Sequence, residues 1–144
     1  MTKLTNKVAL ITGGTSGIGK AAAIDFLENG ASVIVTGRNS TGVDETLAEL
    51  GKQAQGIVSD AGNMEDLKQL KDKVTAISPL IDILFVNAGF GKYAPIELID
   101  EAHFDEQFNV LVKGTLFTVQ QILPLMKEGG AIVLNTSIVT EIGL

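Results

Sequence analysis

The chain has 144 residues, of which 45% are hydrophobic, and its formal net charge is −6. This length suits one domain, and the apolar content is enough to fill its core. The acidic balance argues against a nucleic-acid partner, because binding phosphates needs massed basic side chains. Cysteine is absent, which excludes a disulfide framework and a thiolate metal site.

No stretch of the sequence has the pattern of a targeting or membrane segment. Residues 1–7 lack an apolar secretory core, and no apolar run approaches the ~20 residues that a membrane helix needs. The single histidine, His103, cannot build a metal cluster, and we interpret it as a surface or packing residue. We therefore expect a cytoplasmic protein that uses no metal ion.

The stretch from Val8 to Gly19 organises the rest of the chain. Residues 8–11 are an apolar run typical of a parallel strand buried on both faces. A glycine-rich turn follows, and the apolar spacing after it predicts a helix over residues 20–29. The first turn of a helix offers unpaired backbone N–H groups and the positive end of its dipole. The junction therefore predicts a diphosphate site.

The remaining segments alternate between strand and helix patterns. Strands are predicted over residues 32–36, 54–58, 81–86 and 131–135, and helices over residues 43–50, 63–77 and 101–127. This alternation predicts an α/β fold: a Rossmann-like, doubly wound parallel sheet with strand order 3-2-1-4-5 and right-handed crossovers. We expect residues 1–144 to form one dinucleotide-binding domain, incomplete at its C-terminal end after the fifth strand. The inward side chains predicted on the last helix are Phe104, Phe108, Leu111, Thr115, Val119 and Ile122.

Arg38 follows the second predicted strand, where dinucleotide-binding folds that use NAD place an acidic residue against the ribose hydroxyls. A guanidinium at this position, beside Asn39, suits a ribose 2′-phosphate, because its forked donors match phosphate oxygens. The sequence therefore predicts NADP in preference to NAD. The alternative is a solvated surface arginine that contacts no ligand.

Two further loops follow predicted strands at the same edge of the sheet. Asp60 and Ala61 come after the third strand, and a carboxylate there can accept a hydrogen bond from the adenine amino group. Alternatively, Asp60 caps the next helix. Asn87, Ala88 and Gly89 form a second glycine turn after the fourth strand.

These motifs give the sequence its family resemblance. The pattern T-G-x-x-x-G-x-G from Thr12 to Gly19 resembles the cofactor loop of the short-chain dehydrogenase/reductase family, and residues 87–89 resemble its Asn-Ala-Gly motif. The resemblance implies hydride transfer between a nicotinamide and a small carbonyl or alcohol substrate. The cofactor-binding residues that we predict are Gly13, Thr15, Ser16, Gly17, Ile18, Gly19, Arg38, Asn39, Asp60, Ala61, Asn87, Ala88 and Gly89.

Ser137 is the one catalytic residue that we predict. It follows the fifth strand at the cofactor edge, where its hydroxyl can bond a substrate carbonyl, and it resembles the family's substrate-orienting serine. The family's Tyr-x-x-x-Lys motif is missing, because the only tyrosine, Tyr93, has Glu97 four residues later. In family order the motif would follow Leu144. We therefore expect no turnover from the 144-residue chain alone.

The long predicted helix departs from the family pattern at one position. The family usually has a catalytic asparagine three residues before the glycine that corresponds to Gly114, and here that residue is Leu111. Asn109 points about 200° away on a regular helix, so it cannot substitute. The options are a local irregularity of the helix, a different proton relay or impaired activity.

Two other functions compete with an oxidoreductase. A non-catalytic nucleotide-binding module would explain the missing proton donor. An S-adenosylmethionine-dependent methyltransferase also has a glycine turn after its first strand, but Arg38 replaces the acid that would hold the ribose. The uncovered fifth strand leads us to expect a homo-oligomer.

Overall fold

The computed structural model describes residues 3–137 as a parallel sheet with helices on both faces. Within these residues the strand order is β3-β2-β1-β4-β5, which confirms the predicted Rossmann-like fold. The strands are β1 (Val8–Ile11), β2 (Ser32–Gly37), β3 (Ala54–Val58), β4 (Ile81–Val86) and β5 (Met126–Leu134).

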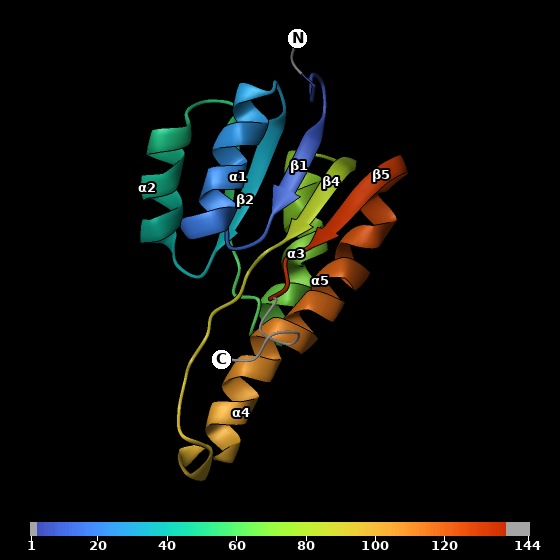
Figure 1. The fold of residues 1–144 in the computed structure, drawn as a ribbon. Coiled ribbons are helices and arrows are strands. Elements are labelled where there is room, and N and C mark those ends of the chain that lie inside the picture. Colours follow the sequence, from blue (N-terminus) through green and yellow to red (C-terminus); the bar gives the residue numbers. More distant parts are fainter. Residues whose placement is uncertain (1–2, 138–144) are drawn as a thin grey trace.

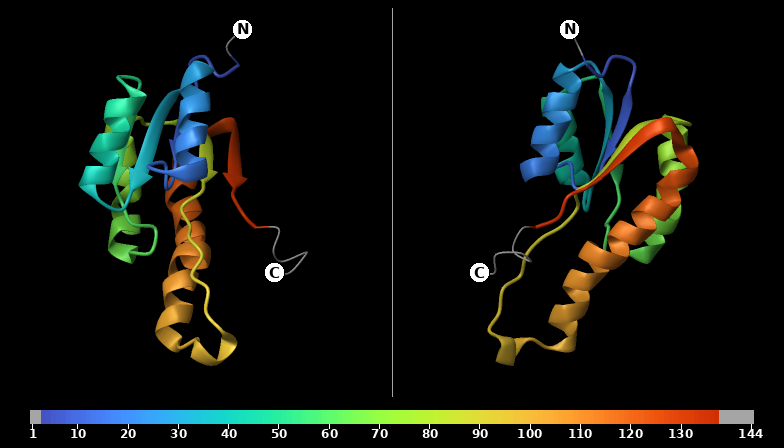
Figure 2. Two further views of the ribbon diagram at one scale, coloured as in Figure 1. Left: turned by 60° about the vertical axis from the view of Figure 1, so that its left-hand side comes forward. Right: turned by 45° about the vertical axis from the view of Figure 1, so that its right-hand side comes forward.

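The helices divide between the two faces of the sheet (Figures 1 and 2). Helices α1 (Gly17–Glu28) and α2 (Ser40–Leu50) cover one face, and α3 (Met64–Ile77) and α5 (Thr115–Ile122) cover the other. This division follows from right-handed crossovers that run outward from β1 in both directions. The direction changes between β1 and β4, so the loops after these two strands meet at the carboxyl edge of the sheet.

Two apolar clusters fill the space between the sheet and its helices. Leu10 of β1 belongs to the cluster on the α3 side, while its neighbour Ile11 belongs to the cluster on the α1 side. Successive side chains of a strand point to opposite faces, so the unbroken apolar run of β1 supplies both layers. The larger cluster consists of Leu10, Ile34, Ile57, Leu67, Leu70, Val74, Ile81, Leu84, Val86, Ile122 and Leu125.

The prediction of one helix over residues 101–127 is wrong in two respects. The chain forms α4 (Glu101–Phe108), a π-helical segment η2 (Asn109–Gly114), α5, and a 3-10 turn η3 (Leu123–Leu125). Strand β5 then begins at Met126, because Pro124 cannot continue the helix. Gly129 and Gly130, which follow the predicted helix, lie within β5 where its register shifts against β4.

The predicted inward face of this helical stretch holds only in its C-terminal part. Ile122 is fully buried, whereas Phe104, Phe108 and Leu111 are exposed. Figure 1 shows the reason: α4 extends past the carboxyl edge of the sheet, so none of the strands β1 to β5 lies beneath it. The short helix η1 (Ile96–Leu98) forms part of the connection that leads from β4 to the far end of α4.

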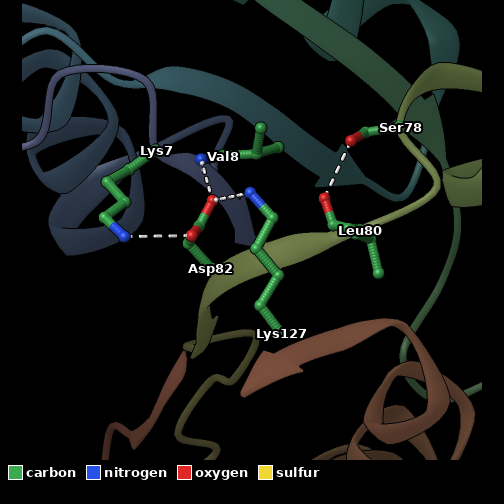
Figure 3. A network of polar contacts seen from close by, with 6 residues as sticks. All are labelled: Lys7, Val8, Ser78, Leu80, Asp82 and Lys127. Carbon is green, nitrogen blue, oxygen red and sulfur yellow. Dashed lines mark hydrogen bonds and ion pairs between the residues drawn. The ribbon is translucent and has the colours of Figure 1, made fainter. Parts of the chain in front are cut away.

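Asp82 ties three strands together at the amino edge of the sheet (Figure 3). Its Oδ2 accepts a hydrogen bond from the backbone N–H of Val8 at 2.9 Å and from Nζ of Lys127 at 2.8 Å. Nζ of Lys7 donates to Oδ1 at 3.2 Å. The side chain of Asp82 is only 7% exposed, so its charge is stabilised by these donors instead of by water. This cluster holds β1, β4 and β5 in place at the edge opposite the glycine turns.

Candidate functional site

The first glycine turn leads from β1 into the N-terminus of α1 at the carboxyl edge of the sheet. The backbone N–H of Thr12 donates to Phe85 O, and that of Gly14 donates to Thr36 O, both at 3.0 Å. Ser16 is the N-cap residue of α1, and its side chain makes no capping hydrogen bond. The first turn of α1 also contains no acidic residue. Its N–H groups therefore remain available to an anion.

Gly19 allows the first turn of α1 to pack directly against both glycine turns. A Cβ atom at this position would meet the carbonyl oxygen of Gly13 and would lie 2.5 Å from Nδ2 of Asn87. Any side chain here would push the helix away from the turn. The close packing is what brings the N-terminus of α1 over the ends of β1 and β4.

Asn87 and Thr12 join the two glycine turns. Nδ2 of Asn87 donates to the carbonyl oxygens of Thr12 and Gly13, at 3.1 Å and 3.2 Å. In return, Oγ1 of Thr12 accepts hydrogen bonds from the backbone N–H groups of Asn87 and Ala88, both at 3.0 Å. The two turns therefore form one hydrogen-bonded unit, and the predicted residues on them lie close together.

Sequence reasoning missed two members of this unit, Thr12 and Asn135. Nδ2 of Asn135 donates to Oδ1 of Asn87 at 2.9 Å. One signal for this pair was that an asparagine directly follows each of the two neighbouring strands, Asn87 after β4 and Asn135 after β5. Reading it required the register between β4 and β5, which only the structure provides.

Arg38 lies at the end of β2 and is exposed. Within residues 3–137 its guanidinium makes no hydrogen bond or ion pair, so its donors can reach a ligand. Asn39 has a local role as the N-cap of α2, where its Oδ1 accepts a hydrogen bond from the N–H of Gly42 at 2.8 Å. The cap fixes the start of α2 immediately after Arg38.

Asp60 lies at the end of the neighbouring strand β3 and does not cap α3. That role belongs to Asn63, whose Oδ1 accepts from the N–H of Glu65 at 2.9 Å, so the capping alternative for Asp60 is wrong. Oδ1 of Asp60 instead accepts from the N–H of Gly62 at 2.8 Å. This turn fixes the carboxylate at the same sheet edge as Arg38.

The π-helical segment places Leu111 against the second glycine turn. A Cβ atom at Gly89 would lie 2.9 Å from Cδ2 of Leu111. At the end of the segment, a Cβ atom at Gly114 would overlap the carbonyl oxygen of Ala61. The helix irregularity considered from the sequence is therefore present, and it brings an apolar side chain to the site where the family usually has an asparagine.

An open apolar groove of about 410 Å³ continues from Leu111 toward β5. Its walls come from the π-helical segment, α5 and the last residue of β5. The lining residues are Leu111, Val112, Thr115, Leu116, Val119 and Leu134.

The three remaining residues with reactive side chains, Ser137, Tyr93 and His103, differ in how far they are exposed. Ser137 follows β5 and is exposed. Tyr93 lies on the connection to α4 and is 80% exposed. His103 is buried, and its Nε2 lies 2.9 Å from Nε2 of Gln107, so of the two interpretations, surface or packing residue, the structure agrees with the second. In the described part of the chain, no cluster of His, Cys, Asp or Glu is suited to a metal ion.

No helix in residues 3–137 has both the length and the apolar character needed to span a membrane.

Comparisons with known proteins fit this geometry. The model of the short chain dehydrogenase family matches residues 7–144. Oxidoreductase asL5 of Sarocladium schorii is 40% identical over 137 residues, which is 94% of this chain and 55% of that protein. The chain spans about half the length of the curated relatives it matches.

Two solved structures with the same fold are complexes with nicotinamide cofactors. A 3-ketoacyl-(acyl-carrier-protein) reductase from Brucella melitensis, complexed with NADH, superposes with a TM-score of 0.91 at 29% identity, covering 99% of this chain and 62% of that one. A putative short chain dehydrogenase from Escherichia coli CFT073, complexed with NADPH, gives 0.86 at 30% identity, covering 99% and 63%. With its glycine turns, strand order and family match in agreement, this chain belongs to the short-chain dehydrogenase family.

Proposed function

We propose that the chain is the cofactor-binding part of an NADP-dependent oxidoreductase that interconverts a small carbonyl compound and an alcohol. The observation that carries this proposal is the uncapped N-terminus of α1, packed through Gly19 onto the glycine turns. Backbone N–H groups and a helix dipole at that point favour a diphosphate. A dinucleotide suits this site, because the two halves of such a ligand extend in opposite directions from a central diphosphate.

The adenosine half is assigned to the side of β2 and β3. Arg38 supplies a permanently charged, forked donor without a competing partner in residues 3–137, which supports a role in binding the ribose 2′-phosphate. On the adjacent strand, Asp60 would accept from the adenine amino group, with Ala61 beside it. Asn39 would complete this side next to Arg38.

The nicotinamide half is assigned to the side of β4 and β5. Asn87, Ala88 and Gly89 would border it, and the hydroxyl of Ser137 would orient the substrate carbonyl. When bound, the nicotinamide supplies or accepts the hydride. The protein's task is then to hold the two reacting carbons together and to limit access of water.

A second candidate function, nucleotide binding without turnover, is favoured by one observation. No Tyr-x-x-x-Lys motif occurs in the 144 residues, and the single tyrosine is largely exposed on a connecting segment. Carbonyl reduction needs a positioned proton donor in addition to the hydride source. We therefore propose that the 144-residue chain binds the cofactor but does not catalyse carbonyl reduction.

Calorimetric titration of the purified chain with NADPH, NADH and S-adenosylmethionine separates the candidates. We expect the tightest binding with NADPH. Binding of S-adenosylmethionine in the absence of pyridine-nucleotide binding would contradict the proposal. A steady-state assay with a panel of small aldehydes and ketones then distinguishes an enzyme from a binding module, and measurable NADPH oxidation would refute the claim that this chain is inactive alone.

We also propose that the chain forms homo-oligomers. In residues 3–137, the outer edge of β5 pairs with no strand, and Phe104 and Phe108 stack at 4.0 Å between ring centroids while each remains about half exposed. Unpaired edges and apolar patches of this kind favour association. Light scattering during size-exclusion chromatography should report a mass above 15.1 kDa, and a stable monomer at high protein concentration would contradict this.

A further inference from the structure

Asn135 is held on the end of β4 by two hydrogen bonds. Its backbone N–H donates to Val86 O at 2.9 Å, which extends the ladder between β4 and β5 by one residue. Its side-chain Nδ2 donates to Oδ1 of Asn87, also at 2.9 Å. The side chain therefore reaches sideways along the carboxyl edge of the sheet toward the two glycine turns.

The hydrogen-bonding capacity of Asn87 shows what this contact does. The Nδ2 of an asparagine has two hydrogens, and in Asn87 they are directed to the carbonyl oxygens of Thr12 and Gly13. Its Oδ1 then needs a donor, which Asn135 provides. An amide turned by 180° would have nearly the same shape, so hydrogen-bond partners decide its orientation. Asn135 selects the orientation in which Asn87 donates to the first turn.

This orientation matters for anion binding at the first turn. Carbonyl oxygens that faced the crevice would repel a diphosphate, and Asn87 holds those of Thr12 and Gly13 by donating to them. The first turn of α1 packs against the Gly13 carbonyl and against Nδ2 of Asn87, because these two groups bound the space at Gly19. The position of the N–H groups of α1 therefore depends on the amide of Asn87.

We propose that Asn135 is a positioning residue for dinucleotide binding. By donating to Asn87 it fixes the amide that holds the Thr12 and Gly13 carbonyls, and so pre-orders the turn that receives the diphosphate. The identity of the ligand rests on the proposed function, whereas the pre-ordering is a property of the free chain. Asn135 lies two residues before Ser137, so one hydrogen-bonded chain links the strand end that carries the serine to the diphosphate turn.

The first test measures pre-ordering without any ligand. Asn135→Ala and Asn135→Asp each remove the donor, the second with almost no change of shape. We expect the backbone N–H groups of Asn87 and Ala88, which donate to Thr12 Oγ1, to exchange with deuterium roughly tenfold faster in both variants. Because Asn135 is exposed, the melting temperature should change little. Unchanged exchange at these amides would overturn the proposal.

The second test asks whether the effect reaches the diphosphate. We expect both variants to weaken NADPH binding by roughly tenfold, and to leave binding of adenosine 2′-monophosphate, which lacks a diphosphate, unchanged. Equal losses for both ligands would indicate a general structural role and overturn the proposal. A loss confined to Asn135→Asp would indicate simple charge repulsion, with the same consequence.

A control variant and the wild type complete the design. Gln53→Glu makes the same change of charge in an exposed residue at the amino end of β3, and it should alter neither exchange at the turns nor NADPH affinity. If the wild-type chain does not bind NADPH, the proposed function fails. The exchange measurement then still decides whether Asn135 orders the turns.

Discussion

Nζ of Lys127 lies 2.8 Å from Oδ2 of Asp82, so the start of β5 is tied to the start of β4 by a nearly buried carboxylate. Burial alone would raise the pKa of Asp82, but hydrogen bonds from Lys127, Val8 and Lys7 outweigh it and lower the pKa from 3.8 to about 2. A carboxylate whose pKa is lower in the folded state stabilises the fold above its unfolded pKa. The cluster therefore stabilises the sheet at neutral pH.

The first prediction concerns acid stability. The contribution of Asp82 should be fully present above about pH 4 and should be lost as the pH falls from 4 to 2. The shift corresponds to about 2 kcal/mol. Urea unfolding of Asp82→Asn at pH 7 should show a loss of about this size, with a smaller further loss at low pH than the wild type. Asp72→Asn, on the exposed face of α3, is the control, and an equal loss from it would contradict the prediction.

The second prediction concerns Arg38. Arg38→Ala should weaken NADPH binding by about ten- to hundredfold, because a charge-assisted bond to phosphate is lost, and should affect NADH binding much less. Calorimetry with both nucleotides measures the difference. Lys71→Ala removes a positive charge from an exposed position on α3 and should change neither affinity. Equal losses of NADPH and NADH binding in Arg38→Ala would remove this residue from the 2′-phosphate site.

The third prediction concerns Gly19. In Gly19→Ala the new methyl group meets the Gly13 carbonyl and the Asn87 amide, so α1 must move away from the turns. We expect a loss of about 1 to 3 kcal/mol in stability together with a loss of NADPH binding. Gly42→Ala is a matched control near the start of α2, where a Cβ atom approaches only Asn39 Oδ1, at 3.3 Å. If Gly19→Ala bound NADPH with wild-type affinity, the site would have to lie elsewhere.

Much of the fold could be predicted because its signals are local. Val8 to Ile11 form an apolar run long enough for one buried strand, and the glycine turn after it marks the start of α1. Arg38 could be placed at the sheet edge because it directly follows a β-branched strand. The alternation of strands and helices then gives a parallel sheet with right-handed crossovers.

The features that escaped prediction depend on contacts between distant segments. The π-helical segment ends where Gly114 packs against the carbonyl of Ala61. Ala61 lies about fifty residues earlier in the chain. Helical periodicity marked Phe104 as inward, but none of the strands β1 to β5 lies beneath α4 to cover it. The role of Asn135 depends on the register of β5 against β4. None of these relationships leaves a pattern within a single window of sequence.

The last prediction compares a buried leucine of β4 with an exposed leucine just before this strand. Leu84 of β4 is fully buried in the cluster between the sheet and helices α3 and α5. Leu84→Ala removes apolar contacts and leaves a cavity that a packed sheet cannot close, so it should cost about 2 to 5 kcal/mol. Leu80, just before β4, is 45% exposed, and Leu80→Ala makes the same chemical change with an expected cost of under about 1 kcal/mol. Denaturant unfolding of the two variants measures the difference, and equal costs would mean that β4 is not the centre of the core.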